Sequence, residues 1–269
     1  HLKKLVLLKF FLLFFFTVGF SQGKDNVLTE SGNFSIGCNY WASHAGTNTW
    51  KDWRPDIIEQ DFKQLSENGI KILRVFPLWP DFQPIYKFYV SSGRLNYIGS
   101  KDGVPIPLSG IGSSGVSEEQ LQHFEEFARL AQKYELKLIV GLVTGWMSGR
   151  LHVPPALEGV RIIADAESLY WQQKFVTAFV NRLKNQPAII AWDFGNECNV
   201  MDWEATKYQA YTWMSVLTGA IRSEDNTRPV VSGMHGLRSE KNFNWSIVDQ
   251  AALTDLLTTH PYFLHTAYA

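Results

Sequence analysis

Residues 188–199 read Ala-Ile-Ile-Ala-Trp-Asp-Phe-Gly-Asn-Glu-Cys-Asn, an apolar run that ends abruptly in an amide and a carboxyl side chain. A short apolar run of this kind is typical of a strand buried on both faces of a parallel sheet. Asn196 and Glu197 would then lie at the carboxyl end of the strand, which in a barrel of parallel strands carries the active site. The stretch predicts both a parallel sheet and the position of its functional site.

Five further apolar or β-branched runs are expected to form strands: 34–40, 70–76, 136–143, 229–231 and 253–259. Helix signals stand between them. They are Pro55 at a first helical position, a capping box at 117–120, helical periodicity over 167–184 and 203–222, and a short segment at 246–252. Strands that alternate with helices predict an α/β fold with a parallel sheet.

Six such units are compatible with an open doubly wound sheet or with three quarters of an eight-stranded barrel, and the pattern alone does not decide. The turn at 38–46 contains neither Gly-x-Gly-x-x-Gly nor Gly-x-x-x-x-Gly-Lys, which disfavours a nucleotide-binding sheet. Two long segments, 77–116 and 144–164, follow strands as the active-site loops of a barrel do. We therefore expect an incomplete (β/α)8 TIM barrel, with about six of the eight units present.

Composition narrows the class of protein. The 269 residues are 45% hydrophobic and carry 25 basic against 26 acidic side chains, which predicts one globular domain over 22–269. A nucleic-acid binder needs clustered positive charge, so no nucleic-acid partner is expected. Cys38 and Cys198 would lie at the ends of different strands, too far apart for a disulfide.

The first 21 residues have the character of a leader. Lys3 and Lys4 precede an apolar run from Leu5 to Phe20, which only Lys9 interrupts. This pattern is typical of a secretory signal peptide. A permanent membrane anchor is the alternative, and it is disfavoured because the run falls short of a bilayer span. We expect an exported protein, whether secreted, periplasmic or held at the cell surface, without a stable membrane anchor.

Glu197 is the strongest candidate for chemistry. Burial among aromatic groups disfavours the charged form of a carboxyl, so we expect a raised pKa that suits proton transfer. Glycoside hydrolysis requires such a group. The alternative is a solvated loop carboxylate beside a turn-forming Asn196. The apolar strand that precedes the pair favours the catalytic interpretation.

The chain resembles the retaining glycosidases of glycoside hydrolase family 5 over about residues 34–263. The likeness rests on Gly-Cys-Asn-Tyr-Trp at 37–41, Ile-Leu-Arg-Val-Phe at 72–76, the motif at 192–197 and His-Pro-Tyr at 260–262. It implies a TIM-barrel hydrolase without a cofactor that acts on a β-linked poly- or oligosaccharide of mannan or glucan type.

The resemblance also implies roles for individual residues. Glu197 would be the general acid and base, and Asn196 would hold the sugar 2-hydroxyl. Arg74 would orient the nucleophile, and His260 and Tyr262 would line the side of the sixth strand. From the residues alone, Arg74 is either a structural ion pair or the partner of a catalytic carboxylate, and His260 is either a core histidine or a site residue.

Further candidates for substrate binding are His235, on the rim after the fifth strand, and three tryptophans that follow strands one to three. These are Trp41, Trp79 and Trp146. Indoles at such positions can stack on sugar rings, although Trp is more often a core residue. No histidine pair or His-x-His has metal-ligand spacing, so no metal is expected.

The family places its nucleophile on the seventh strand, and this chain stops at Ala269, just after the sixth. We therefore expect the nucleophile to be missing from the fragment and the fragment alone to be inactive. A carbohydrate-binding barrel without catalysis is the alternative function.

Overall fold

The parallel sheet predicted from the sequence is present. The structure, a computed structural model, describes residues 27–32, 34–107, 109–236 and 244–261. Its main sheet has the strand order β1-β2-β6-β9-β10, and every neighbouring pair is parallel. The strands are β1 (Gly37–Tyr40), β2 (Ile72–Val75), β6 (Lys137–Gly141), β9 (Ile189–Asp193) and β10 (Val230–Val231).

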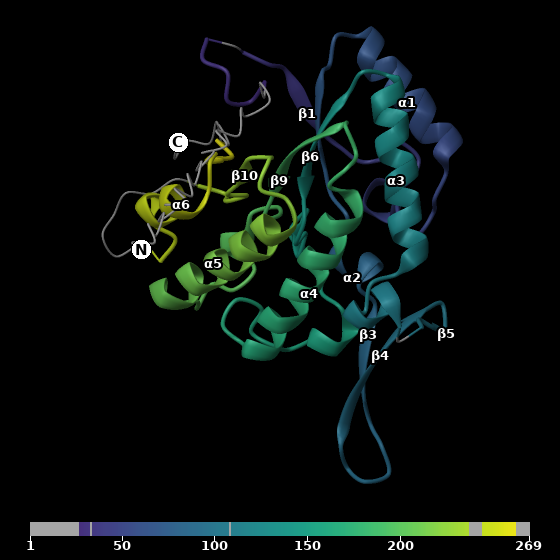
Figure 1. The fold of residues 1–269 in the computed structure, drawn as a ribbon, viewed down its shortest axis with the longest axis vertical. Coiled ribbons are helices and arrows are strands. Elements are labelled where there is room, and N and C mark those ends of the chain that lie inside the picture. Colours follow the sequence, from purple (N-terminus) through teal and green to yellow (C-terminus); the bar gives the residue numbers. More distant parts are fainter. Residues whose placement is uncertain (1–26, 33, 108, 237–243, 262–269) are drawn as a thin grey trace, which may run out of the picture.

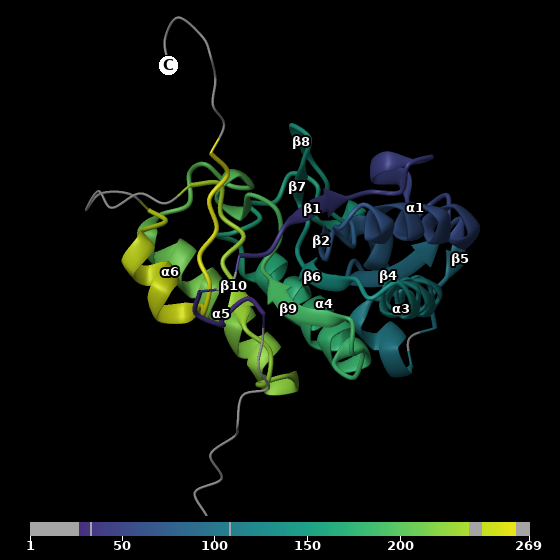
Figure 2. The ribbon, with the colours of Figure 1, turned by 90° about the horizontal axis from the view of Figure 1, so that it is seen from above.

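Four long helices connect these strands and lie along the outer side of the curved sheet (Figures 1 and 2). They are α1 (Pro55–Glu67), α3 (Glu118–Lys133), α4 (Ala166–Leu183) and α5 (Lys207–Glu224), and the shorter α6 (Ile247–Leu253) follows. The predicted start signals operate as expected: Pro55 occupies the first turn of α1, and the Ser117 side chain accepts from the Gln120 amide of α3.

Aromatic side chains fill the layer between the helices and the sheet. Phe124 of α3 packs edge-on against Phe179 of α4 at a ring separation of 5.0 Å, and Phe179 contacts Trp192 of β9. The Trp192 indole donates to buried Asp225 after α5 at 2.9 Å. Fully burying a large apolar side chain contributes about 1.5–3 kcal/mol, so this layer holds β9 and its carboxyl end in place.

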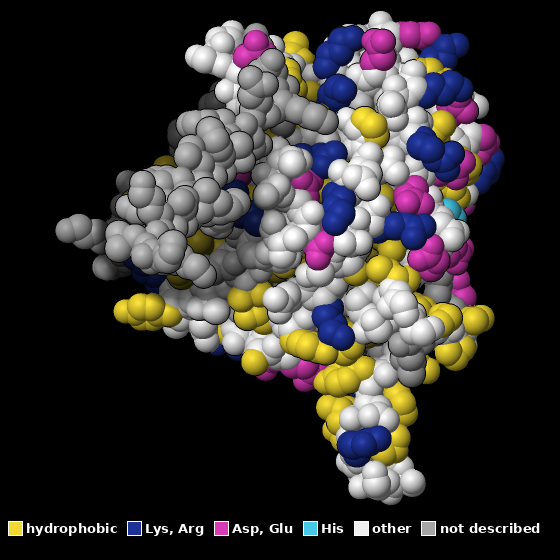
Figure 3. Space-filling model, viewed as in Figure 1, with side chains coloured by type: hydrophobic (Ala, Val, Ile, Leu, Met, Phe, Trp, Pro, Cys, Tyr) yellow, Lys and Arg dark blue, Asp and Glu magenta, His cyan; other side chains and the backbone are white. Residues whose placement is uncertain are grey.

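The two long segments contain more regular structure than the sequence predicts. Residues 77–116 form α2 (Trp79–Phe82), the antiparallel strands β3 (Ile85–Tyr89), β4 (Leu95–Lys101) and β5 (Val104–Pro105), and the 3-10 turn η2 (Gly110–Ser114). The β3–β4 hairpin projects from the body and carries hydrophobic side chains on both sides (Figures 1 and 3). Residues 144–164 form the hairpin of β7 (Trp146–Met147) and β8 (Arg150–Leu151) and the turn η3 (Pro155–Leu157).

Two element predictions are wrong. The expected strand at 253–259 is reduced to a single parallel bridge between Leu256 and Val231. The expected helix from residue 203 begins at Lys207, because Thr206 and Gln209 form a reciprocal capping box that fixes the start.

The described strands form part of a barrel, and the predicted incomplete TIM barrel is confirmed. In the described sheet β1 pairs with β2 alone and occupies one edge. The expected leader and Tyr262 lie outside the described residues. Among the residues that are described, no helix has the length and apolar character to cross a membrane.

Candidate active site

Arg74 donates hydrogen bonds to three residues of the segment 193–196, at the carboxyl end of the sheet. Its Nε donates to Asp193 Oδ2 at 2.7 Å, its Nη2 to the Gly195 carbonyl at 2.7 Å, and its Nη1 to Asn196 Oδ1 at 3.2 Å. The Asp193 side chain is fully buried, and burial raises its pKa while Arg74 opposes that rise. Three contacts in different directions fix the plane of the guanidinium.

Asn196 is held from both ends of its amide. Its Oδ1 accepts from Arg74, and its Nδ2 donates to the Trp146 carbonyl in β7 at 3.0 Å. The residue is 7% exposed. The amide is therefore fixed at the floor of the site rather than serving as a turn former.

Glu197 accepts two imidazole contacts on one oxygen. Its Oε1 lies 2.7 Å from His260 Nδ1 and 3.1 Å from His235 Nδ1. Its backbone is left-handed, with φ 51°, a conformation that non-glycine residues seldom adopt and that is found at functional sites. Its side chain is 12% exposed.

The pKa of Glu197 is shifted downward, whereas the sequence predicts an upward shift. Burial raises it, but the hydrogen bonds from His260 and His235 outweigh burial, and the pKa lies below the ordinary value. The prediction of a raised pKa is wrong for this state of the site, because the sequence shows the apolar strand but not the two donors.

Arg74 also fixes the tautomer of His260. Its Nη1 lies 3.4 Å from His260 Nε2, and a guanidinium has donors only, so Nε2 must be the accepting nitrogen. The hydrogen of the neutral ring is then on Nδ1, where it is donated to Glu197. The hydrogen bonds of these three residues all run the same way: Arg74 donates to His260, and His260 donates to Glu197.

The same three ligand atoms are close enough to be considered for a metal. Glu197 Oε1, His235 Nδ1 and His260 Nδ1 lie within 4.8 Å of one another. A metal would need the lone pair of His260 Nδ1, and the ring hydrogen would then face the Arg74 donor. The geometry fits a hydrogen-bonded cluster better than a metal centre.

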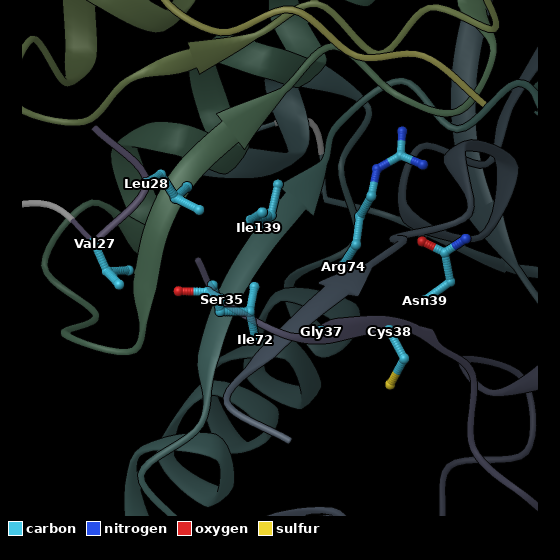
Figure 4. Close-up of a pocket in the computed structure, with 9 residues that line it drawn as sticks. All are labelled: Val27, Leu28, Ser35, Gly37, Cys38, Asn39, Ile72, Arg74 and Ile139. Atoms are coloured by element: carbon cyan, nitrogen blue, oxygen red, sulfur yellow. The ribbon is translucent and has the colours of Figure 1, made fainter. Parts of the chain in front are cut away.

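A cavity of about 500 Å³ lies on the inner side of the sheet below Arg74. Figure 4 shows Arg74 and Asn39 on one side of it and Val27 and Leu28 on the other, with Ile139 between. Asn39 and Arg74 are register partners on β1 and β2. The polar end of the cavity therefore belongs to the same site as Asp193.

The chain is similar to known glycoside hydrolases. A model described as "Glycosyl hydrolases family 2, TIM barrel domain" matches residues 155–261. A probable mannan endo-1,4-beta-mannosidase F of Neosartorya fischeri is 25% identical over 204 residues, which cover 72% of this chain and 41% of that protein. The chain thus spans less than half the length of this relative.

Two solved structures share the fold. A GH5_18 from Bifidobacterium longum subsp. infantis matches with a TM-score of 0.67 and 19% identity, covering 85% of this chain and 50% of that one. An exo-beta-1,4-mannosidase from Opitutaceae bacterium strain TAV5 matches with a TM-score of 0.62 and 22% identity, covering 75% and 32%. The chain therefore shares the barrel fold of these two glycosidase structures.

Within this barrel the structure brings together five of the predicted site residues: Arg74, Asn196, Glu197, His235 and His260. Trp146 joins them through its backbone carbonyl. Trp41 stacks on Phe76 at 5.6 Å and is half-buried. Whether these residues bind substrate stays a prediction.

Trp79 does not belong to the site. It is fully buried in α2, and its indole donates to Gln83 Oε1 at 2.8 Å. An enclosed ring cannot stack on a sugar, so its prediction as a substrate-binding residue is wrong. Cys38 and Cys198 are both free thiols.

Sequence reasoning missed Asp193. It noted that Arg74 needs an acidic partner, and the carboxylate stood in the quoted motif. The strand register brings the two residues near each other. Arg74 of β2 pairs with Ile139 of β6, and Asp193 of β9 pairs with Gly141, two positions further along the same strand.

Proposed function

We propose that this chain forms part of the catalytic domain of an exported retaining glycoside hydrolase that cleaves β-1,4-linked mannan. The observation that carries the proposal is the Glu197 carboxyl at the end of β9, fixed by His235 and His260 beside the Arg74-held amide of Asn196. A carboxyl held in this way can exchange a proton with a glycosidic oxygen.

Mannan is favoured over glucan as the substrate. The relative from Neosartorya fischeri is named as a mannan endo-1,4-beta-mannosidase, and one structure of the same fold is named as an exo-beta-1,4-mannosidase. Both names specify a β-1,4-mannosidic bond. The word "endo" in the name of the sequence relative supports cleavage within the mannan chain. The length of the first products tests this, because internal cleavage releases oligosaccharides before single sugars.

The proton that Glu197 delivers is placed by its hydrogen bonds. Oε1 accepts from two imidazoles, so the hydrogen of the neutral carboxyl belongs on Oε2. Oε2 then protonates the leaving oxygen while a second carboxylate attacks the anomeric carbon and forms the glycosyl ester. Glu197 next takes a proton from water, whose oxygen attacks the anomeric carbon and releases the sugar.

The lowered pKa of Glu197 must rise for it to act as an acid near neutral pH. A second carboxylate about 5–5.5 Å away, the separation in retaining glycosidases, disfavours ionisation of its neighbour. Sugar that excludes water from the site acts in the same direction. We propose that the nucleophile belongs to a later strand of the full-length protein.

Export rests on the leader pattern of residues 1–21. We propose cleavage after the apolar run, near Ser21. Amino-terminal sequencing of protein recovered outside the producing cell tests this: a mature start within a few residues of Ser21 is expected, whereas an intact leader on a membrane-bound product would contradict it.

The test of catalysis compares E197Q with E204Q in the full-length protein. Glu204 is an exposed carboxylate on the same loop, so its variant controls for loss of charge. E197Q should lose hydrolysis of mannan yet keep part of its rate on aryl mannosides, whose leaving groups need no proton. E204Q should keep both activities.

Two outcomes would contradict the proposal. Unchanged mannan hydrolysis by E197Q would remove Glu197 from the mechanism. Binding of mannan by the wild type without any hydrolysis would favour the non-catalytic carbohydrate-binding barrel.

A further inference from the structure

His235 stands where the chain leaves β10, and its backbone is fixed on both sides. Its amide donates to Asn199 Oδ1 at 2.8 Å, and its carbonyl accepts from the His260 amide at 2.8 Å. The first of these contacts connects it to the turn that follows Glu197. The position of the imidazole is therefore set by the same elements that position Glu197 and His260.

The His235 ring donates to Glu197. Its Nδ1 lies 3.1 Å from Oε1, and an ionised carboxylate can only accept. In the part of the chain that the structure describes, the charged and titratable groups around this contact include His260, Arg74 on β2, Asp193 on β9 and the buried thiol of Cys198. Of the two imidazoles that contact Oε1, that of His260 is also held by Arg74 through its Nε2.

The two rings differ in their access to solvent. The His235 side chain is 44% exposed, whereas that of His260 is 17% exposed. A ring at the edge of the site can be replaced by a small molecule from solution. A ring enclosed between Arg74 and Glu197 cannot be replaced in the same way.

We propose that His235 is a positioning residue for Glu197. Its imidazole is the second donor to Oε1, and this contact orients the carboxyl group so that Oε2 faces the leaving oxygen. This inference rests on the proposed function. Without His235, Oε1 keeps the His260 contact but loses its second imidazole donor, so the orientation of the carboxyl group is less restricted. With both donors on Oε1, the two oxygens keep separate tasks.

The experiment uses three variants of the full-length protein: H235A, H235N and H235Q. The amide nitrogen of Asn reaches the position of imidazole Nδ1, whereas that of Gln reaches the position of Nε2. H235A should lower kcat on mannan by about tenfold to a hundredfold, the effect of losing a hydrogen bond to a charged group, with little change in KM. H235N should recover most of the rate, and H235Q should not.

Added imidazole provides the second measurement. It should raise kcat of H235A in a saturable manner, because the vacated position faces solvent. It should not rescue H260A, whose ring position is enclosed. A merely structural role for His235 would give neither the difference between Asn and Gln nor the rescue.

The outcomes separate this inference from the proposed function. If E197Q is inactive on mannan and H235A retains the wild-type kcat, the positioning role is wrong and the proposed function stands. Equal rates for H235N and H235Q, or a slow H235A that imidazole does not rescue, would also overturn the positioning role. If E197Q is fully active, the proposed function itself fails.

Discussion

The Arg74 guanidinium and the Asp193 carboxylate form a buried pair that joins β2 to β9 across the intervening strand β6. Their Nε and Oδ2 atoms are 2.7 Å apart, and the Asp193 side chain is fully enclosed. The remaining nitrogens of the same guanidinium reach Gly195, Asn196 and His260. One ion pair therefore sets the geometry of the whole site.

Removing one partner of this pair should destabilise the fold strongly. An R74M variant leaves the Asp193 carboxylate buried without its cation, which costs about 3–5 kcal/mol in the free energy of unfolding. The double variant R74M/D193L removes both charges and should recover much of this loss. Urea unfolding monitored by tryptophan fluorescence measures both values. A double variant no more stable than R74M would contradict the assignment.

The tautomer of His260 gives a prediction that does not depend on activity. Because Arg74 donates to Nε2, the neutral ring should carry its hydrogen on Nδ1. Nitrogen-15 NMR with long-range proton correlations distinguishes the two tautomers. Dominance of the Nε2–H form would break the proposed chain from Arg74 through His260 to Glu197.

Much of the barrel could be predicted from the sequence, because its signals are local. Strands such as Ile189–Asp193 are continuous apolar runs, and helices such as α3 begin at capping residues. The β3 strand could not be predicted from alternation, because the apolar and aromatic residues of Ile85–Tyr89 do not alternate with polar ones; in the structure four of the five are exposed.

The polar contacts of the site could be predicted only in part. The position of Glu197 follows from one strand end, and this inference was local. The contacts of Asp193 with Arg74 and of His235 with Glu197 join residues 119 and 38 positions apart. They depend on strand register and on the turn at Gly233, which no local pattern shows.

The lowered pKa of Glu197 predicts how stability depends on pH. A folded-state pKa below the unfolded value means that ionisation favours the folded state. This contribution is present above the ordinary value of 4.5 and is lost as the pH falls through the lowered value. The stability difference between wild type and E197Q should therefore shrink as the pH falls below about 4.5.

Urea midpoints measured from pH 7 down to pH 3 test this sign, and H260A provides the comparison. This variant removes the hydrogen bond from His260 Nδ1, which lowers the Glu197 pKa, so the pH dependence should become weaker in an H260A background. A difference between wild type and E197Q that grows with acidity would contradict the donor arrangement.

Two glycines should respond to alanine with opposite signs. Gly233 has φ +63°, and a Cβ there would lie 2.4 Å from Asp193 Oδ1 and 2.5 Å from the Gly195 carbonyl. The left-handed backbone alone costs a non-glycine residue about 1–2 kcal/mol, and the contacts would push Asp193 away from Arg74. G233A should therefore lose both stability and mannan hydrolysis.

Gly219 is the matched control, because it lies within α5, is exposed, and has open space around an added Cβ. G219A should raise the free energy of unfolding by about 0.5–1 kcal/mol, since alanine favours the helix, and should leave hydrolysis unchanged. Urea unfolding and mannan assays on the two full-length variants measure the contrast. If G233A kept wild-type activity, the turn after β10 would not be what positions Asp193 and Glu197.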